Sequence, residues 1–247
     1  MDRCNGIKGR GVRLERDYHD PIFIHMKRIF LLISPVLFLF SCKKENTLPI
    51  VETIAKGSKW NLQIGSAPAE VYSQLQKLGV EKNFTDVAIG YRQPYLKPEA
   101  LQGRLNLYRA VTLQKNSVYV ERVVIEFRQD KVSSIETGGT MLDSIPEWPQ
   151  DTPEETKIHN NDPVDVIYSK LLAIYRFPAY SNYQLILSDK PLEKPYDADM
   201  ANYNEWSFNF SSDVRPGRRG TSYVTLHFSN GKLNKIRFEY NEADFYN

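Results

Sequence analysis

The feature that most constrains this fold is a helix pattern that the chain carries twice. Residues 71–78 read VYSQLQKL and residues 167–174 read IYSKLLAI, so both segments follow [VI]-Y-S-x-L-x-x-[LI]. In each copy the large aliphatic residues recur at i, i+4 and i+7, which places them on one side of an α-helix. Such a stripe has to be buried against another element, and the apolar face of an antiparallel sheet fits it. Both segments are therefore predicted to be helices that cover a sheet.

The flanking residues predict where the two helices begin and end. Ser66 and Asp162 are residue types whose side chains accept hydrogen bonds from the first backbone N–H groups of a helix. Pro68 and Pro163 suit the first turn, where a missing N–H leaves no hydrogen bond unmade. Gly79 follows the first stripe and is predicted to end the first helix.

A second repeated block predicts β-hairpins. Residues 123–135 read VVIEFRQDKVSSI and residues 224–236 read VTLHFSNGKLNKI. Alternating apolar residues on both sides of a two-residue turn are typical of a hairpin, and Asn230-Gly231 is among the most favourable turn pairs. Two further alternating runs lie between helix and hairpin in each copy, at residues 87–91 and 105–113, and at residues 183–187 and 206–210.

The order of these blocks indicates an internal duplication. The copies are 96 residues apart at the helix and 101 residues apart at the hairpin. Independent occurrence of common amphipathic patterns is the alternative. We predict an α+β fold of two tandem units, each a helix on a four-stranded antiparallel sheet. The units are expected at residues 60–139 and 162–247, with a Pro-containing polar linker at residues 140–161.

A hydrophobic run near the N-terminus predicts export and lipidation. Residues 26–42 read MKRIFLLISPVLFLFSC, in which a basic pair precedes twelve residues, ten of them apolar. This run is short for a bilayer crossing but has the size of the hydrophobic region of a secretory signal. Its end resembles the lipobox of bacterial lipoproteins, in which the cysteine, here Cys42, takes the lipid. Residues 26–41 are predicted to be a lipoprotein signal peptide and residues 42–59 the acylated cysteine and its tether; an ordinary cleaved signal or a core helix is the alternative.

Residues 1–25 are polar and unpatterned, although a signal peptide should begin the protein. We therefore expect translation to start at Met26 and interpret residues 1–25 as a mis-called extension, with a long n-region as the alternative. The first 42 residues hold seven of the 32 Lys and Arg and four of the 30 Asp and Glu, so the rest of the chain has a formal charge of −1. Nucleic-acid binding requires a concentrated basic face, and no nucleic-acid partner is predicted.

Removal of the leader would leave Cys42 as the only cysteine. An internal disulfide, a thiolate metal cage and a cysteine nucleophile are then excluded. Bacterial lipoproteins carry several acyl chains on this cysteine, and several chains hold a protein stably at a membrane. Lys43 stands where an Asp would favour inner-membrane retention in some bacteria. We expect a lipid-anchored outer-membrane protein that faces either the periplasm or the cell surface.

The order of elements over residues 62–240 resembles the β-lactamase inhibitor protein-like fold. Each unit opens with a Pro and an acidic residue at a helix start and closes with a hairpin of the pattern F-x-[QN]-[DG]-K-[VL]-x-x-I. Small outer-membrane lipoproteins of the SmpA/OmlA type share the single unit. The chain departs from the family by lacking its disulfides and by a longer version, GSAPAEV at residues 65–71, of its Gly-x-[ST]-x-x-[DE]-V run. The resemblance implies binding of other proteins across an open sheet face.

Few residues suggest catalysis or metal binding. His159 and His227 are the two histidines after the leader, and both are interpreted as surface residues rather than general bases. The zinc-protease and serine-hydrolase motifs are absent from the sequence. Asp197 and Asp199 could ligate a hard cation, but the pattern of a calcium loop is missing, and a solvated loop is the simpler interpretation. No enzyme activity, cofactor or metal is predicted.

Two groups of side chains are candidates for binding. Arg215, Arg218 and Arg219 form the densest basic patch, expected between two strands, where they could hold an anion or a partner or merely keep a turn soluble. Tyrosines at strand ends and in loops offer rigid area with a polar tip, which suits recognition. These candidates are Tyr91, Tyr95, Tyr175, Tyr180 and Tyr183.

Together these observations predict a non-catalytic envelope lipoprotein, held at the membrane through lipid on Cys42. It would bind a partner protein or another envelope component through its sheet face or loops. A carbohydrate-binding lipoprotein that uses the Tyr-rich loops is the alternative, and a hydrolase is the third hypothesis. An exposed apolar sheet face would favour a protein partner, whereas a narrow groove floored by aromatic rings, with acidic and amide groups, would favour a sugar.

Overall fold

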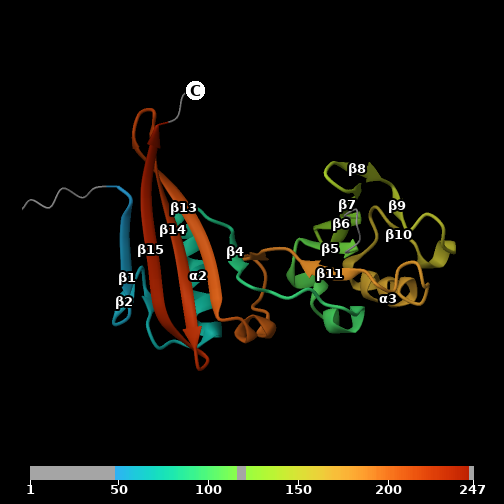
Figure 1. Ribbon diagram of the computed structural model, residues 1–247, viewed down its shortest axis with the longest axis horizontal. Helices are drawn as coiled ribbons and strands as arrows, with labels where there is room; N and C mark the ends of the chain where they lie inside the picture. Colours follow the sequence, from blue (N-terminus) through green and yellow to red (C-terminus); the bar gives the residue numbers. More distant parts are fainter. Residues whose placement is uncertain (1–47, 116–120, 245–247) are drawn as a thin grey trace, which may run out of the picture. The chain divides into compact units, whose positions relative to one another are not determined.

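The computed structural model describes residues 48–115 and 121–244, which belong to one compact unit. Strands dominate this part of the chain, which contains two α-helices and two large antiparallel sheets (Figure 1). No helix in this part of the chain combines the length and the apolar character needed to cross a membrane. The predicted signal peptide and Cys42 lie outside the described residues. The expected tether, residues 42–59, is not a plain linker, because residues 50–54 form a strand that pairs with residues 236–240.

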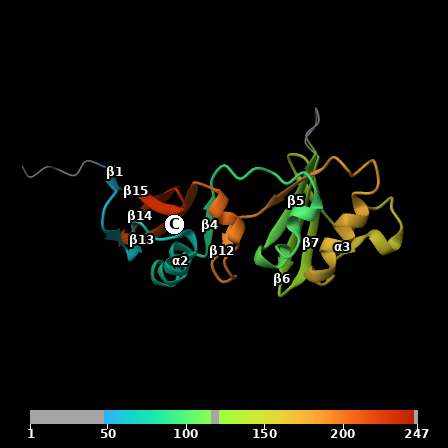
Figure 2. The ribbon, with the colours of Figure 1, turned by 90° about the horizontal axis from the view of Figure 1, so that it is seen from below.

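The larger sheet has six strands in the order β1-β15-β14-β13-β4-β12, of which β12 is labelled in Figure 2 and the others in Figure 1. Three long consecutive strands form its middle, one short strand flanks β15, and two short strands flank β13. The strands are β1 (Ile50–Ile54), β4 (Asp86–Ile89), β12 (Lys190–Pro191), β13 (Glu205–Arg215), β14 (Arg218–Ser229) and β15 (Lys232–Asp244).

Helix α2 (Pro68–Lys82) covers one face of this six-stranded sheet. Its aliphatic stripe, Val71, Leu75 and Leu78, belongs to the same buried cluster as Trp206 of β13 and Leu226 of β14. Because β13 and β14 come more than 120 residues later in the sequence, this core is built from distant segments.

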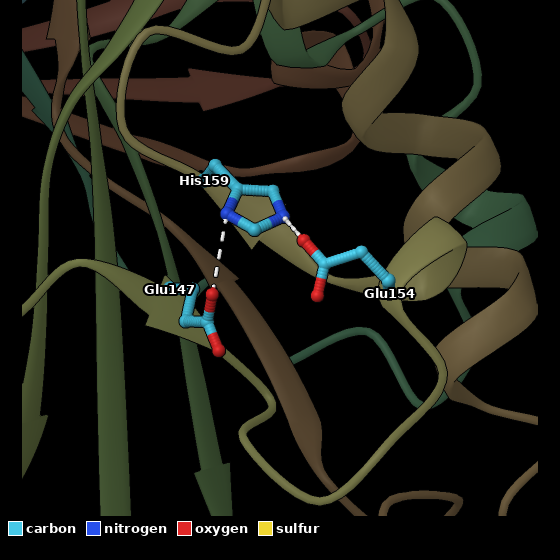
Figure 3. Close-up of side chains that lie close together, drawn as sticks. All are labelled: Glu147, Glu154 and His159. Carbon is cyan, nitrogen blue, oxygen red and sulfur yellow. Dashed lines mark ion pairs between the residues drawn. The ribbon is translucent and has the colours of Figure 1, made fainter.

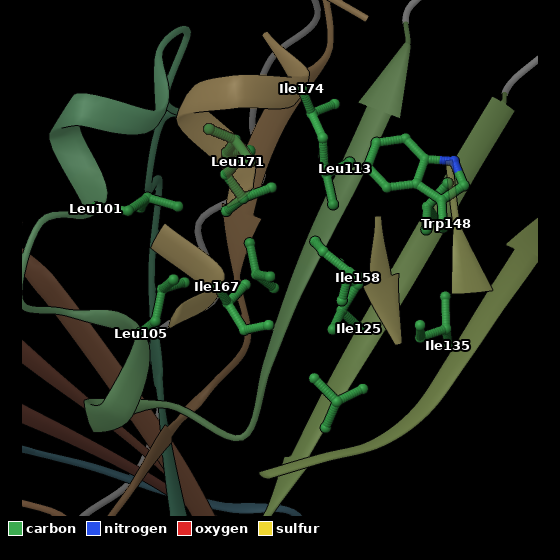
Figure 4. Packing of buried hydrophobic residues seen from close by; sticks show 14 of the residues in the cluster. Leu101, Leu105, Leu113, Ile125, Ile135, Trp148, Ile158, Ile167, Leu171 and Ile174 are labelled. Carbon is green, nitrogen blue, oxygen red and sulfur yellow. The ribbon is translucent and has the colours of Figure 1, made fainter. Parts of the chain in front are cut away.

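The smaller sheet has five strands in the order β11-β5-β6-β7-β8, and helix α3 (Val164–Ile174) packs against it (Figures 2 and 4). Ile167, Leu171 and Ile174 of the helix share a buried cluster with Leu113 and Ile125 of the sheet. The strands are β5 (Ala110–Lys115), β6 (Glu121–Arg128), β7 (Lys131–Gly138), β8 (Leu142–Ile145) and β11 (Gln184–Leu187).

The predicted fold class, two tandem units with a helix on a four-stranded sheet in each, is wrong. The described chain is mostly β, its sheets have six and five strands, and each helix packs on the sheet that contains the hairpin of the other repeat. Each of the two cores therefore contains residues from both expected units, 60–139 and 162–247. The physical reason lies in the repeat itself: two nearly identical aliphatic stripes fit either sheet, and their periodicity does not specify which.

The expected linker, residues 140–161, is folded and packs with the five-stranded sheet and α3. It contains β8, the 3₁₀ turn η4 (Glu154–Thr156), and a two-stranded ribbon of β9 (Glu147–Trp148) with β10 (Ile158–His159). Trp148 is 6% exposed and Ile158 is fully buried, so this segment contributes to the core between α3 and the smaller sheet.

Both predicted hairpins are confirmed. β14 and β15 turn at Asn230 and Gly231, with φ angles of 52° and 68°, and β6 and β7 turn at Gln129 and Asp130, with φ angles of 52° and 57°. Positive φ at both central residues matches the right-handed twist of the flanking strands. Each hairpin carries one register shift, close to the turn.

Pro68 lies in the first turn of helix α2 as predicted, but both ends of the helix are stabilised differently. Ser66 does not cap it: Ala67 is the N-cap residue, and the Glu70 carboxylate accepts a hydrogen bond of 3.0 Å from the Ala67 N–H. Gly79 does not end it either, because the helix continues to Lys82. The chain then leaves the helix at Asn83, which has the left-handed φ of 57°.

Helix α3 likewise lacks the predicted cap. Pro163 is the N-cap residue, and the Asp162 carboxylate instead accepts hydrogen bonds of 2.7 Å from the His159 N–H and from Lys170 Nζ. Asp162 therefore joins the helix to the chain that precedes it.

Candidate functional site

Strands β4 and β13 pair over a short stretch and then diverge. Ile89 pairs with Trp206 and Ala88 with Ser207, whereas β13 continues to Arg215. Within the described residues, no strand lies on this side of β13 beyond Ser207. The divergence leaves a cavity of about 890 Å³ along the open edge of β13. We call this cavity the edge groove.

The open edge of β13 presents unpaired main-chain groups to the edge groove. The Glu205 carbonyl points to the β4 side of β13, where it accepts a hydrogen bond of 2.8 Å from the Gly90 N–H. The preceding carbonyl, that of Asn204, points to the β14 side and accepts a hydrogen bond of 2.8 Å from the Phe228 N–H. Because successive residues of a strand direct their main-chain groups to opposite neighbours, odd-numbered residues of β13 face away from β14. Asn209, Ser211 and Asp213 therefore direct their N–H and C=O groups into the groove, and all three side chains are exposed.

One wall of the edge groove is aromatic. Phe84, Phe208 and Phe210 line it on the side of α2. The rings of Phe84 and Phe208 stack with centroids 4.6 Å apart, and Phe84 and Phe210 are 6.2 Å apart. Phe84 is 9% and Phe208 5% exposed, while Phe210 is half-buried. The three rings thus cover one another and leave a narrow apolar surface along the wall.

The opposite wall is acidic. Asp86, Asp189 and Asp213 line it, with Arg219 as its single cation. Asp86 accepts from Arg109 at 2.9 Å and Asp213 lies 3.6 Å from Arg219. Asp189 forms no ion pair with any described residue; partial burial, followed by the charge of Asp86, raises its pKa. Asp189 is therefore the carboxylate of this wall that is left to attract a positive charge.

The outer face of the six-stranded sheet, turned away from α2, is polar. Residues that alternate with the buried ones include Thr225 and His227 on β14 and Arg237 and Glu239 on β15. His227 lies 3.4 Å from Glu205, which agrees with its predicted surface position. An exposed apolar sheet face, the feature expected to favour a protein partner, is therefore not found on this sheet within the described residues.

A second cluster gathers Glu147, Glu154 and His159 beside α3 (Figure 3). His159 Nδ1 lies 3.5 Å from Glu147 and Nε2 lies 3.0 Å from Glu154. Lys157 Nζ contacts the same two carboxylates at 2.7 and 3.1 Å, and this contact lowers the pKa of Glu147. A metal ion would have to displace the lysine, so we interpret the cluster as an ion-pair network. Sequence analysis missed it because the segment was expected to be a linker.

Three of the five candidate tyrosines belong to, or pack against, the core between α3 and the smaller sheet. Tyr180 and Tyr183 contact the ring of Trp148, Tyr175 packs against the same cluster, and Tyr183 is only 1% exposed. The hydroxyl of Tyr175 donates to the Tyr183 carbonyl, and those of Tyr180 and Tyr183 donate to carboxylates. These groups are occupied within the molecule and do not form an open binding surface.

The other two candidate tyrosines are separate from this cluster. Tyr95 donates to Asp199 at 2.7 Å, whereas the side chain of Tyr91 is 81% exposed. None of the five tyrosines lines the edge groove.

The basic patch lies at the turn between β13 and β14, as predicted, but two of its charges are neutralised. Arg218 contacts Glu242 at 2.6 Å, and Arg219 contacts Asp213 at 3.6 Å at the end of the edge groove. Arg215 is exposed. The patch thus contributes one residue, Arg219, to the groove.

The interpretation of Asp197 and Asp199 as a solvated loop is wrong. Asp197 is 4% exposed and accepts hydrogen bonds from the Tyr108 hydroxyl at 2.7 Å and the Asp199 N–H at 3.0 Å. Arg104 contacts both carboxylates, at 3.4 and 2.6 Å. Their oxygens are engaged by these donors, so the pair organises a buried polar network.

Lys190 extends this network into the interior. Its side chain is fully buried, and Nζ donates to the carbonyls of Leu107 and Pro191 at 3.0 and 3.3 Å. The rings of Tyr72 and Tyr108 lie 5.3 and 5.4 Å from Nζ. Burial lowers the pKa of Lys190 to about 8.

Comparison with known proteins adds no relative: no family model, no curated protein and no solved structure matches this chain. The resemblance to the β-lactamase inhibitor protein-like fold thus has no support beyond the sequence patterns.

Proposed function

We propose that this chain is a non-catalytic envelope lipoprotein that binds a partner protein at the edge groove. The observation that carries the proposal is the unpaired edge of β13 at Asn209, Ser211 and Asp213, beside a cavity of about 890 Å³. Free strand edges invite pairing with another chain, and proteins usually blunt or cover them. A long uncovered edge with a groove beside it suits recognition by strand addition.

The groove explains binding better than the sheet face or the tyrosine loops do. The outer face of the larger sheet is polar, and most of the candidate tyrosine hydroxyls are engaged internally. The lining of the groove contains no histidine, cysteine or lysine that could activate a nucleophile. Main-chain pairing needs none of these groups.

The membrane part of the proposal rests on residues 26–42. A basic start, a short apolar run and Cys42 support a lipid anchor, and Lys43 supports the outer membrane. Recovery of the chain in the membrane fraction, and its release by Cys42→Ser, would test this part separately from the groove.

A carbohydrate ligand is the second candidate, favoured by the acidic, amide and aromatic residues of the same groove. Asn83 and Asn209 line it together with the carboxylates and rings. Stacking on a sugar requires an open ring face, however, and Phe84 and Phe208 stack on each other. Tyr223, 54% exposed, is the lining ring most available to a sugar.

Site-specific photo-crosslinking in the native envelope tests the proposed function. A photoreactive amino acid at Ser211, on the open edge, should yield a discrete adduct with one protein. The same probe at Thr53, an exposed residue of β1 at the far edge of the sheet, is the matched control. Equal labelling at both positions, or none at Ser211, would contradict protein binding at the groove. Binding of a glycan that Tyr223→Ala abolishes would favour the second candidate.

A further inference from the structure

We infer that the occupant of the edge groove is an extended segment of a partner protein in which apolar and basic residues alternate, added to β13 as a further strand. This inference rests on the proposed function and specifies the chemistry of its partner. The main chain of β13, the aromatic wall and the acidic wall each set one requirement that the bound segment has to meet.

The main chain requires an extended occupant. Asn209, Ser211 and Asp213 offer three N–H and three C=O groups in register, the pattern that an adjacent strand satisfies. Five residues of β13, 209–213, span about 17 Å at roughly 3.4 Å per residue. A segment of about five to seven residues therefore matches the open edge.

The walls require side chains that alternate in character. Successive side chains of a strand point to opposite faces of the sheet, so an added strand would direct every second side chain towards the α2 face. Phe208 and Phe210 of β13 lie on that face, together with Phe84. Apolar side chains at these positions would extend the aromatic wall and bury more of the half-buried Phe210.

The remaining side chains of the added strand would meet the acidic wall. Of its three carboxylates, Asp86 is paired with Arg109 and Asp213 with Arg219. Asp189 in particular has no ion-pair partner among the described residues. Lysine or arginine side chains at alternate positions would bring a positive charge to Asp189, whereas acidic side chains would be repelled.

Synthetic peptides test the inference with the full-length protein in detergent. The probe is a blocked heptapeptide, Lys-Val-Lys-Phe-Lys-Val-Lys, with a fluorescent label. One control peptide has the same composition in block order, which removes the alternation, and a second replaces every lysine by glutamate. We expect saturable binding of the alternating basic peptide, at least ten-fold tighter than either control, and weaker binding at high salt.

Two variants connect this binding to β13 and to the acidic wall. Ser211→Pro removes an N–H at the open edge, where proline is tolerated, and should weaken peptide binding at least ten-fold. Thr53→Pro, on the edge strand at the other side of the sheet, is its matched control and should bind as the unchanged protein does. Asp189→Asn keeps the shape of the wall and should weaken binding several-fold while reducing its salt dependence. Equal melting temperatures would show that each variant is folded.

Amide hydrogen exchange supplies a second readout that does not depend on a variant. The bound peptide should slow exchange at Asn209, Ser211 and Asp213 and leave β1 unchanged. Equal affinity for the block or glutamate peptide, or no slowing at these amides, would overturn the inference. Slow exchange there without peptide, together with a concentration-dependent dimer, would identify a second copy as occupant and would also overturn it. A crosslinked protein at Ser211 without peptide binding would refute only the partner chemistry, not the proposed function.

Discussion

At the scale of single residues, Lys190 is the least expected feature of the molecule. A lysine with no exposed surface is rare because removing an ammonium from water is costly. Here two carbonyls accept from Nζ and two tyrosine rings surround it. Nothing in the residues around it, DKPLEKP, distinguishes this lysine from the exposed ones, because its burial depends on segments distant in sequence.

We predict that Lys190 makes the stability of the protein rise with pH above about 8. Its folded-state pKa of about 8 lies below the ordinary 10.5. Between these values the unfolded chain binds more protons than the folded one, so the free energy of unfolding increases with pH. The penalty is fully present below pH 8 and amounts to about 3 kcal/mol at most. Denaturant unfolding at pH 7 and pH 9.5 measures it.

Lys190→Met should remove this pH dependence and should not destabilise the protein at pH 7. The exposed Lys232→Met is the control and should keep the pH dependence of the unchanged protein. A Lys190→Met variant that is much less stable at pH 7 and still gains stability with pH would refute this account of the buried amine.

At the scale of elements, helix α2 shows what local patterns predict and what they miss. Its stripe and the position of Pro68 in its first turn follow from spacing and residue type, and the structure agrees. The predicted end of the helix was wrong because Gly79, a residue type that often ends helices, here allows close packing inside the helix. A Cβ at Gly79 would lie 2.7 Å from Leu192 Cδ1 and 2.7 Å from the Phe84 carbonyl oxygen. Such contacts come from segments that the local pattern does not include.

Gly79→Ala should therefore destabilise the protein although alanine is the better helix former. Relief of the two close contacts is expected to cost about 1–3 kcal/mol, against a gain of about 1 kcal/mol from helix propensity. Thermal unfolding measures the difference. Val80→Ala, at the neighbouring 88% exposed position, is the matched control and should change stability by less than about 0.5 kcal/mol. A Gly79→Ala protein as stable as the control would contradict the packing role.

The edge groove could not be predicted at this scale either. Alternation identifies β13 as a strand, yet it does not show which main-chain edges remain unpaired. That property depends on β4 leaving β13 after Ser207, far from β13 in the sequence. Burial, which residue type does not predict, decided the outcome for Tyr183: its side chain is not available to a partner, whereas that of Tyr91 is exposed.

At the scale of the whole molecule, the exchange of helices between the two repeats is the main result. The duplicated blocks were recognisable, but α2 and α3 each pack on the hairpin of the other repeat. The similarity that indicates duplication also makes the helices interchangeable. Pairing partners therefore had to come from the three-dimensional structure.

The exchange predicts that neither repeat folds alone. Residues 60–139 would lack α3, and residues 162–247 would lack α2, so each fragment would expose the sheet face that the missing helix covers. Circular dichroism of the two fragments should show no cooperative melting, whereas residues 48–247 should melt cooperatively. Cooperative unfolding of either fragment on its own would show that the helices are not required where the structure places them.

The most direct test of the central claim is amide hydrogen exchange of the protein in its own membrane. The account predicts that Asn209, Ser211 and Asp213 exchange rapidly in the purified protein and much more slowly in native envelopes, where the partner is present. The amides of β1 should exchange alike in both. Equally rapid exchange at Asn209, Ser211 and Asp213 in the envelope would contradict a partner strand at this edge.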